Sequence, residues 1–313
     1  MSRPWPVEAG SDVSASTAHW WQDDRAWPLV LWGGLLVLSG VVHLAIWGIT
    51  GGPWEGPVTW RKPILFGVTG GLTSLSMGWA WSHLPRWRYD RLLARSATLA
   101  LVVEVGLIDL QCWRGVASHF NRATRFDSLL YDAMGLLILW VTAVILMITA
   151  RFFRQPVAVP ADMLLAVRAG LIFLVISCLL GIWVGINGDL RLQQGLEPEQ
   201  FGRAGVPKFP HGAVIHAIQW LPMLAWAAAG AGFSAATRLR LVSIAARATG
   251  LLLIYAFGET LLGRARFDPP AGLAALLIVA VAGLLLPAGI VAVGLVSRML
   301  RQRLSPPPPA SAA

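Results

Sequence analysis

The strongest constraint in this sequence is a series of apolar stretches that recur along almost its whole length. A helix rises 1.5 Å per residue, so about 20 apolar residues cross the roughly 30 Å hydrocarbon core of a bilayer. The stretches predict an all-α, polytopic integral membrane protein with about eight transmembrane helices. Their approximate ranges are 27–49, 63–83, 96–113, 128–150, 163–187, 212–235, 241–263 and 272–297.

The composition of the chain agrees with a membrane location. Hydrophobic residues make up 56% and charged residues 13%, whereas ordinary globular proteins contain about 25% charged residues. The 16 tryptophans belong to a residue type that favours the lipid headgroup zone. The net charge of +9 is spread over short loops, which argues against nucleic acid as a partner and favours contact with membrane lipids. A small-molecule or lipid ligand and the oligomeric state remain open.

Three regions are expected along the chain. Residues 1–26 are interpreted as an N-terminal interfacial segment, 27–297 as the eight-helix domain, and 298–313 as a basic, proline-rich, disordered tail. Eight crossings place both termini on one side, and that side carries slightly more arginine, which favours cytoplasmic termini. The alanine, arginine, glycine and leucine bias suggests a bacterial protein, so the expected location is the inner (plasma) membrane.

Two pairs of short matches suggest a weak internal duplication of four helices plus four. Lys62-Pro63 precedes the second stretch, and Lys208-Phe209-Pro210 precedes the sixth. Arg125-Phe126-Asp127 and Arg266-Phe267-Asp268 precede the fourth and the eighth. Such repeats are common in membrane proteins. Asp127 and Asp268 are expected to cap the helices that follow them.

The ionisable residues within the stretches predict where a functional site lies. A charged side chain at mid-membrane costs roughly 2.5–3.5 kcal/mol, so it usually faces the bundle interior or a water-filled cavity. The loops after the odd-numbered stretches hold most of the polar loop residues, whereas those after the even-numbered ones, such as Arg151–Arg154 and Arg238–Arg240, are interpreted as lipid anchors. The ionisable residues of the stretches cluster toward the polar loops: His43, Glu104, Asp109, Asp132, His216 and Glu259.

Metal binding is one chemistry that these residue types suit. A catalytic zinc needs three protein ligands and a water, for which His43, His211 and His216 are the candidates. The predicted catalytic residues beside them are Glu104, Asp109, His119 and Glu259. A b-type haem held by His43 and His216 is a less favoured alternative.

Anion binding is another chemistry that the same end of the chain suits. Both lysines of the chain stand directly before predicted helix starts, and the N-terminus of a helix attracts negative charge. The predicted substrate-binding residues are Arg61, Lys62, Arg114, Asn121 and Lys208.

Structural and functional alternatives remain open at this stage. Asp132, Asp109 and Glu259 could instead form ion pairs with Arg125, Arg114 and Arg264 respectively. The leading functional hypothesis is a membrane-embedded enzyme acting on a lipid or lipid-linked substrate near the extracytoplasmic interface. The alternatives are a transporter with Glu104, Asp109 and Glu259 as proton- or cation-coupling carboxylates, and a subunit of a membrane complex.

Overall fold

The computed structural model describes residues 20–304, and most of this part is helical. A short 3-10 helix, Trp20–Gln22, precedes the long helices. The helices in order are α1 (Ala26–Thr50), α2 (Arg61–Ser82), α3 (Asp90–Trp113), α4 (Arg125–Arg154), α5 (Ala161–Gln193), α6 (Lys208–Val214), α7 (Ala217–Gly230), α8 (Ala235–Leu261) and α9 (Ala271–Leu304). All eight predicted stretches correspond to helical segments.

Six helical segments of the described chain are long and apolar enough to cross a membrane: α1, α4, α5, α6 with α7, α8 and α9. The protein is therefore consistent with a multi-pass membrane protein. Helices α2 and α3 are not among the six. Glycine, serine and threonine dilute the apolar character of α2, and α3 carries five charged side chains, namely Asp90, Arg91, Arg95, Glu104 and Asp109.

Two predicted segments differ from the structure in their shape. The stretch at 212–235 is two helices, because the chain breaks at His216, where φ is −89° and ψ is 6°. Helix α9 continues to Leu304, so Arg298–Arg303 belong to a helix and not to an extended tail. Most of the predicted interfacial segment (1–19) and the end of the predicted tail (305–313) lie outside the described residues.

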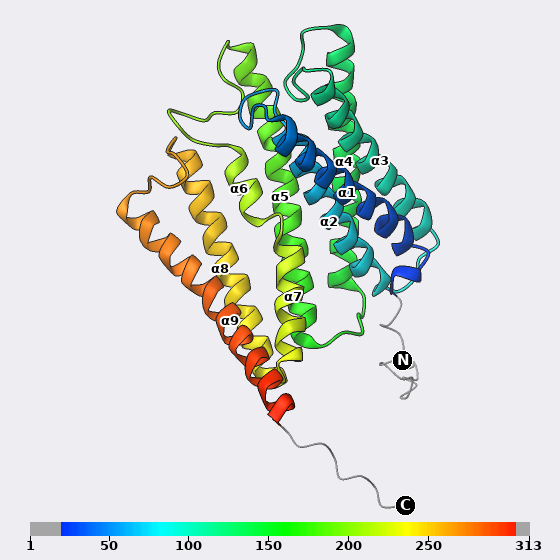
Figure 1. The fold of residues 1–313 in the computed structure, drawn as a ribbon, viewed down its shortest axis with the longest axis vertical. Coiled ribbons are helices and arrows are strands. Elements are labelled where there is room, and N and C mark those ends of the chain that lie inside the picture. Colours follow the sequence, from blue (N-terminus) through cyan, green and yellow to red (C-terminus); the bar gives the residue numbers. More distant parts are fainter. Residues whose placement is uncertain (1–19, 305–313) are drawn as a thin grey trace, which may run out of the picture.

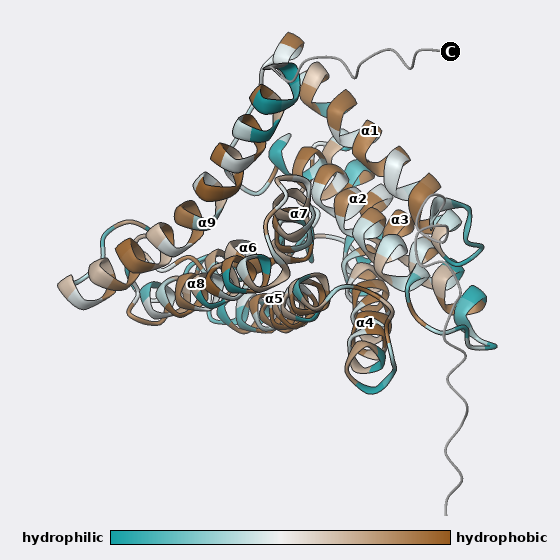
Figure 2. Ribbon diagram, turned by 90° about the horizontal axis from the view of Figure 1, so that it is seen from below, coloured by the Kyte–Doolittle hydropathy of each residue, from teal (hydrophilic) through white to brown (hydrophobic). Residues whose placement is uncertain are grey.

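The helices form two groups that meet along α4, α5, α2 and α7. In Figure 1, α1 crosses obliquely over α2, and the helices that follow run up and down in turn. Contacts between the groups run from α4 to α5 and from α2 to α7. Figure 2, seen from below, places α1 and α9 at the outer edges of the two groups. The loops 51–60, 114–124, 194–207 and 262–270 lie at one end, here called the polar end, as the alternation of helices predicts.

Glycines allow α1 and α2 to approach until their backbones touch. A Cβ atom at Gly71 would lie 2.5 Å from the carbonyl oxygen of Gly33, and one at Gly67 would lie 2.8 Å from the backbone nitrogen of Gly40. Small residues at a helix interface permit this approach, which is a common way to pack membrane helices. The contact brings the polar end of α1 alongside the first turn of α2.

Buried ion pairs hold the opposite end of the bundle. Asp90 lies between Arg25 and Arg151, and the three side chains are 2%, 3% and 10% exposed. Asp162 at the start of α5 accepts a hydrogen bond of 2.8 Å from Arg238 at the start of α8. The interpretation of Arg151 and Arg238 as lipid anchors is therefore wrong, because both guanidinium groups are occupied by carboxylates within the bundle.

Candidate functional site

The only two lysines of the chain meet at one carboxylate at the polar end. Lys208 Nζ lies 2.8 Å from Glu199 Oε2, and Lys62 Nζ lies 4.0 Å from Glu199 Oε1. Lys62 also donates a hydrogen bond of 3.3 Å to the carbonyl oxygen of Pro57. These three side chains, with Arg61 and His119 beside them, are here called the lysine site. They come from both groups of helices.

The charge of Glu199 is fixed by its neighbours. Burial by itself would raise the pKa of this carboxyl, but the hydrogen bond from Lys208 and the positive charges of Lys208, Lys62 and Arg61 outweigh it. The pKa of Glu199 is therefore held below its usual range, and the carboxyl is ionised at neutral pH. One carboxylate faces three cationic groups, so the lysine site carries a local excess of positive charge.

His119 lies beside these cations on the loop between α3 and α4. Its Nδ1 is 2.9 Å from Ser118 Oγ, and its ring packs against Phe66 and Tyr131 with centroid distances of 5.6 and 6.1 Å. Burial, reinforced by the positive charge of Lys62, lowers the pKa of His119 to about 4. The imidazole is therefore neutral at neutral pH.

The lowered pKa of His119 predicts a dependence of stability on pH. The unfolded chain binds a proton at His119 below about pH 6.5, whereas the folded chain does not until about pH 4. Stability from this group is thus complete above pH 6.5 and falls as the pH drops toward 4, by up to about 2 kcal/mol at pH 5. Thermal unfolding in detergent at pH 7 and pH 5 should show a smaller loss for His119→Gln than for the wild type. Equal losses would contradict the assignment.

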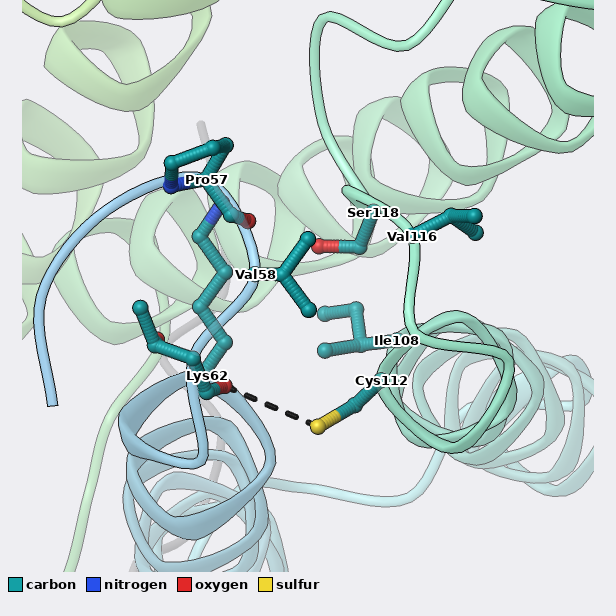
Figure 3. Close-up of a pocket in the computed structure, with 8 residues that line it drawn as sticks. Pro57, Val58, Lys62, Ile108, Cys112, Val116 and Ser118 are labelled. Atoms are coloured by element: carbon teal, nitrogen blue, oxygen red, sulfur yellow. Dashed lines mark hydrogen bonds between the residues drawn. The ribbon is translucent and has the colours of Figure 1, made fainter. Parts of the chain in front are cut away.

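A shallow hollow adjoins the lysine site. Figure 3 shows its lining: Lys62 extends from the first turn of α2 toward Pro57, and Cys112 points in from α3. The Cys112 thiol donates a hydrogen bond of 3.6 Å to the carbonyl oxygen of Thr59. The hollow has no room for a water molecule, so a lipid headgroup would have to bind at the open surface or displace part of the loops.

Two of the predicted substrate-binding residues hold the loop between α3 and α4 in place. Arg114 Nη1 lies 2.7 Å from Asp127 Oδ1. The Asn121 amide donates to the carbonyl oxygen of Ala117 at 2.9 Å and accepts from the backbone N–H of Ala123 at 3.1 Å. The polar groups of Arg114 and Asn121 are thus engaged within the protein, whereas Arg61, Lys62 and Lys208 gather around Glu199.

None of the three ion pairs considered from the sequence is present in the described chain, because one member of each pair binds a different residue. Arg114 pairs with Asp127 and not with Asp109, and Asp132 pairs with Arg122 at 2.8 Å and not with Arg125. Arg264 pairs with Asp268 at 3.0 Å, four residues further along the chain, and not with Glu259.

The helix caps also differ from the expectation. Helix α4 begins at Arg125, and its cap is Thr124, whose hydroxyl accepts from the backbone N–H of Asp127. Asp127 receives hydrogen bonds from Arg114, Gln111 and Thr124. Asp268 lies in the loop before α9, where its carboxylate accepts a hydrogen bond from Arg264. Both aspartates therefore bind arginine, so capping was the wrong interpretation of Asp127.

The predicted metal-ligand histidines are engaged in separate hydrogen bonds. His43 Nε2 accepts from Trp113 Nε1 at 3.0 Å, and its Nδ1 lies 2.9 Å from the carbonyl oxygen of Ser39. His211 Nδ1 lies 2.8 Å from the carbonyl oxygen of Ser177. His216 lies at the break before α7, with Nδ1 3.3 Å from Gln219 Oε1.

This arrangement does not suit a metal or a haem. Within residues 20–304, no group of three or more His, Cys, Asp or Glu side chains is placed to hold a metal ion. A zinc site needs three such ligands, and His43 has no ring nitrogen left for haem iron. The lysine site is therefore interpreted without a metal.

The predicted catalytic carboxylates are carried by α3 and α8 and form no ion pair with the lysines of the lysine site within the described residues. Glu104 is 4% exposed, and Asp109, on the same helix, accepts a hydrogen bond of 3.1 Å from Ser39. Glu259 is 0% exposed, and both of its carboxyl oxygens are buried without a hydrogen-bond partner in the described chain.

Sequence reasoning did not identify Glu199, the residue on which the lysine site centres. It lies in the long loop between α5 and α6, where no periodicity marks one side chain over another. The one signal in the sequence was the scarcity of lysine. If the two lysines of an arginine-rich chain lie close together, a carboxylate is needed between them to balance their charges. No protein-family model, no curated protein and no solved structure matches this chain, so the geometry alone carries the functional interpretation.

Proposed function

We propose that the chain crosses the membrane eight times, as two four-helix halves related by duplication. The pattern of helix contacts supports this arrangement. In the first half, α1 packs on α2 and α3, and α3 packs on α2 and α4; in the second half, α5 packs on α6–α7 and α8, and α8 packs on α7 and α9. Four crossings in each half make the repeats parallel, related by an axis along the membrane normal. Lys62 and Lys208 then occupy equivalent positions in the two halves.

The lysine site at the junction of these halves binds an anionic group of a lipid or lipid-linked substrate. The observation that carries this proposal is the convergence of Lys62 and Lys208, with Arg61, on the single carboxylate of Glu199. A carboxylate in this position occupies the place that a ligand phosphate would take, since ammonium groups bind either anion. A bacterial inner membrane with cytoplasmic termini would place the site on the extracytoplasmic side.

His119 gives this site the means to act on its ligand. A bound anion offsets the positive charges of Lys62 and Lys208 that help to lower the pKa of His119. With the ligand bound, the imidazole is then the candidate to take a proton from a substrate hydroxyl or from water, which is the role of a general base. The function that we propose is therefore a membrane-embedded enzyme acting on a phosphorylated lipid. No metal enters this scheme.

The binding step is tested with a short-chain lipid that carries a phosphate-monoester headgroup, added to the purified chain in detergent. The Lys62→Ala/Lys208→Ala double variant should bind it at least about tenfold more weakly, a loss of about 1.4 kcal/mol or more. Glu199→Gln should bind it more tightly, because the competing carboxylate is removed. His119→Gln should retain binding and lose any turnover of the bound lipid.

The control variant is Arg240→Ala/Arg303→Ala, which removes the same charge from exposed positions at the other end of the bundle. It should bind the lipid as the wild type does. An equal loss in both double variants, or weaker binding by Glu199→Gln, would refute a specific site. Competition by inorganic phosphate distinguishes recognition of phosphate alone from recognition of the whole lipid.

A transporter is the second candidate, and Glu259 is the observation that favours it. A carboxyl group with both oxygens buried and unpartnered within a bundle is typical of proton-coupling positions in membrane transporters. In that case Glu259→Gln would abolish a pH-dependent flux in proteoliposomes and leave lipid binding at the lysine site unchanged.

A further inference from the structure

A second polar group lies between α1 and α3, separate from the lysine site. Ser39 and His43 come from α1, and Asp109, Trp113 and Glu104 come from α3. The Ser39 hydroxyl donates to Asp109 Oδ2 at 3.1 Å, and the Trp113 indole donates to His43 Nε2 at 3.0 Å. The ring of Trp60, just before α2, covers the group, with centroids 6.1 Å from His43 and 5.3 Å from Trp113.

The hydrogen bonds of His43 fix its protonation state. An indole N–H can only donate, so Nε2 of His43 must be the unprotonated, accepting nitrogen. Nδ1 faces the carbonyl oxygen of Ser39 at 2.9 Å, and a carbonyl can only accept, so Nδ1 carries the hydrogen. The imidazole is therefore neutral and supplies no positive charge to Asp109.

Within residues 20–304, neither carboxylate of this group forms an ion pair with a lysine or an arginine. Asp109 Oδ1 is buried without a hydrogen-bond partner in the described chain, and Glu104, 4% exposed, lies within electrostatic range of Asp109. From α2, Lys62 faces the thiol of Cys112 next to Asp109, but Pro57 and Glu199 already bind its ammonium group. Two negative charges left unbalanced in an apolar surrounding are strongly unfavourable.

We propose that Ser39, His43, Glu104, Asp109 and Trp113 form a proton-binding site, in which the two carboxyl groups together keep at least one exchangeable proton at neutral pH. The proton comes from water and forms an O–H bond at the free oxygen of Asp109, and Glu104 is its second carrier. Asp109 is only partly buried as a residue and lies one turn before the end of α3, so we expect the proton to exchange with water from the polar end. The proton site does not depend on the anion site proposed above.

Carbodiimide labelling tests the proposal, because dicyclohexylcarbodiimide reacts with protonated carboxyl groups in apolar surroundings. The full chain in detergent is labelled over a range of pH, and the adducts are mapped by mass spectrometry. Asp109 or Glu104 should be labelled at neutral pH and lose the label as the pH rises. In Glu104→Gln the labelling of Asp109 should fall off at least about one pH unit lower, because coupled carboxyls shift each other's titration.

Asp132 is the internal control, since its side chain is 55% exposed and paired with Arg122 and should remain unlabelled. The proposal is overturned if Asp109 and Glu104 react no more than Asp132 in the folded chain while all three react after denaturation. It is also overturned if sodium ions block the labelling, which would make the group a metal-cation site. The wild-type measurement needs no variant to fold.

Discussion

Replacing Asp90 by alanine should lower the free energy of unfolding by about 3–5 kcal/mol, a large part of the roughly 5–15 kcal/mol that keeps an ordinary protein folded. Asp90 lies 3.3 Å from Arg25 Nη1, bonds to Arg151, and accepts a hydrogen bond of 2.9 Å from the backbone N–H of Trp87. Its removal leaves the buried guanidinium group of Arg151 without its carboxylate partner, while Arg25 keeps Asp23 at 2.8 Å. Breaking a buried pair from one side costs far more than the pair itself contributes, because the remaining charge stays desolvated.

Arg86→Ala is the matched control for this measurement. Arg86 also belongs to an ion pair at the same end of the bundle, 3.6 Å from Asp23, but its side chain is 64% exposed. Exposed pairs contribute about 0–1 kcal/mol, so the midpoint of thermal unfolding in detergent should hardly move. If Asp90→Ala were as mild as Arg86→Ala, water would have to reach the buried arginines, and the ion pairs would not hold this end together.

The positions of the helices, and the end of the bundle at which each loop lies, could be predicted from the sequence because they follow from hydropathy and from the alternation of the helices. The apolar stretches gave the positions of the helices, and alternation placed the four polar loops at one end. The helix break at His216 could not be predicted in this way, because the apolar stretch continues across it. In a membrane such a break is tolerated where neighbouring groups satisfy the freed backbone, and no local signal in this stretch marks it.

The partners of charged side chains could not be predicted, because they depend on contacts between distant segments. Asp90 and Arg151 are 61 residues apart, and Asp162 and Arg238 are 76 apart. Nearest-neighbour pairing along the chain gave the wrong partner for Asp132, because Arg122 in the loop before α4, and not the nearer Arg125, lies within 2.8 Å of it. The residue types indicated where charged side chains are concentrated. The pairing of each carboxylate with its cation could be seen only in the folded structure.

The close contact between α1 and α2 leads to the other large expected effect. Gly71→Ala should lower stability by about 1–3 kcal/mol, the usual cost of overpacking, because the new methyl group would lie 2.5 Å from the backbone oxygen of Gly33. A flexible side chain could move aside, but a backbone oxygen within a helix cannot, so the two helices must separate.

Gly70→Ala tests the same helix one residue earlier and should have the opposite sign. Its methyl group would meet Leu101 and Val105 at 3.7 Å, an ordinary contact, and alanine in a helix interior is favoured over glycine by about 1 kcal/mol. Thermal unfolding of both variants in detergent separates the effect of helix contact from that of helix propensity.

Separation of α1 from α2 also withdraws His43 from Trp60 and shifts the first turn of α2, so Gly71→Ala should weaken lipid binding at Lys62. If Gly71→Ala were as stable as Gly70→Ala, the glycine contact would not set the position of α1.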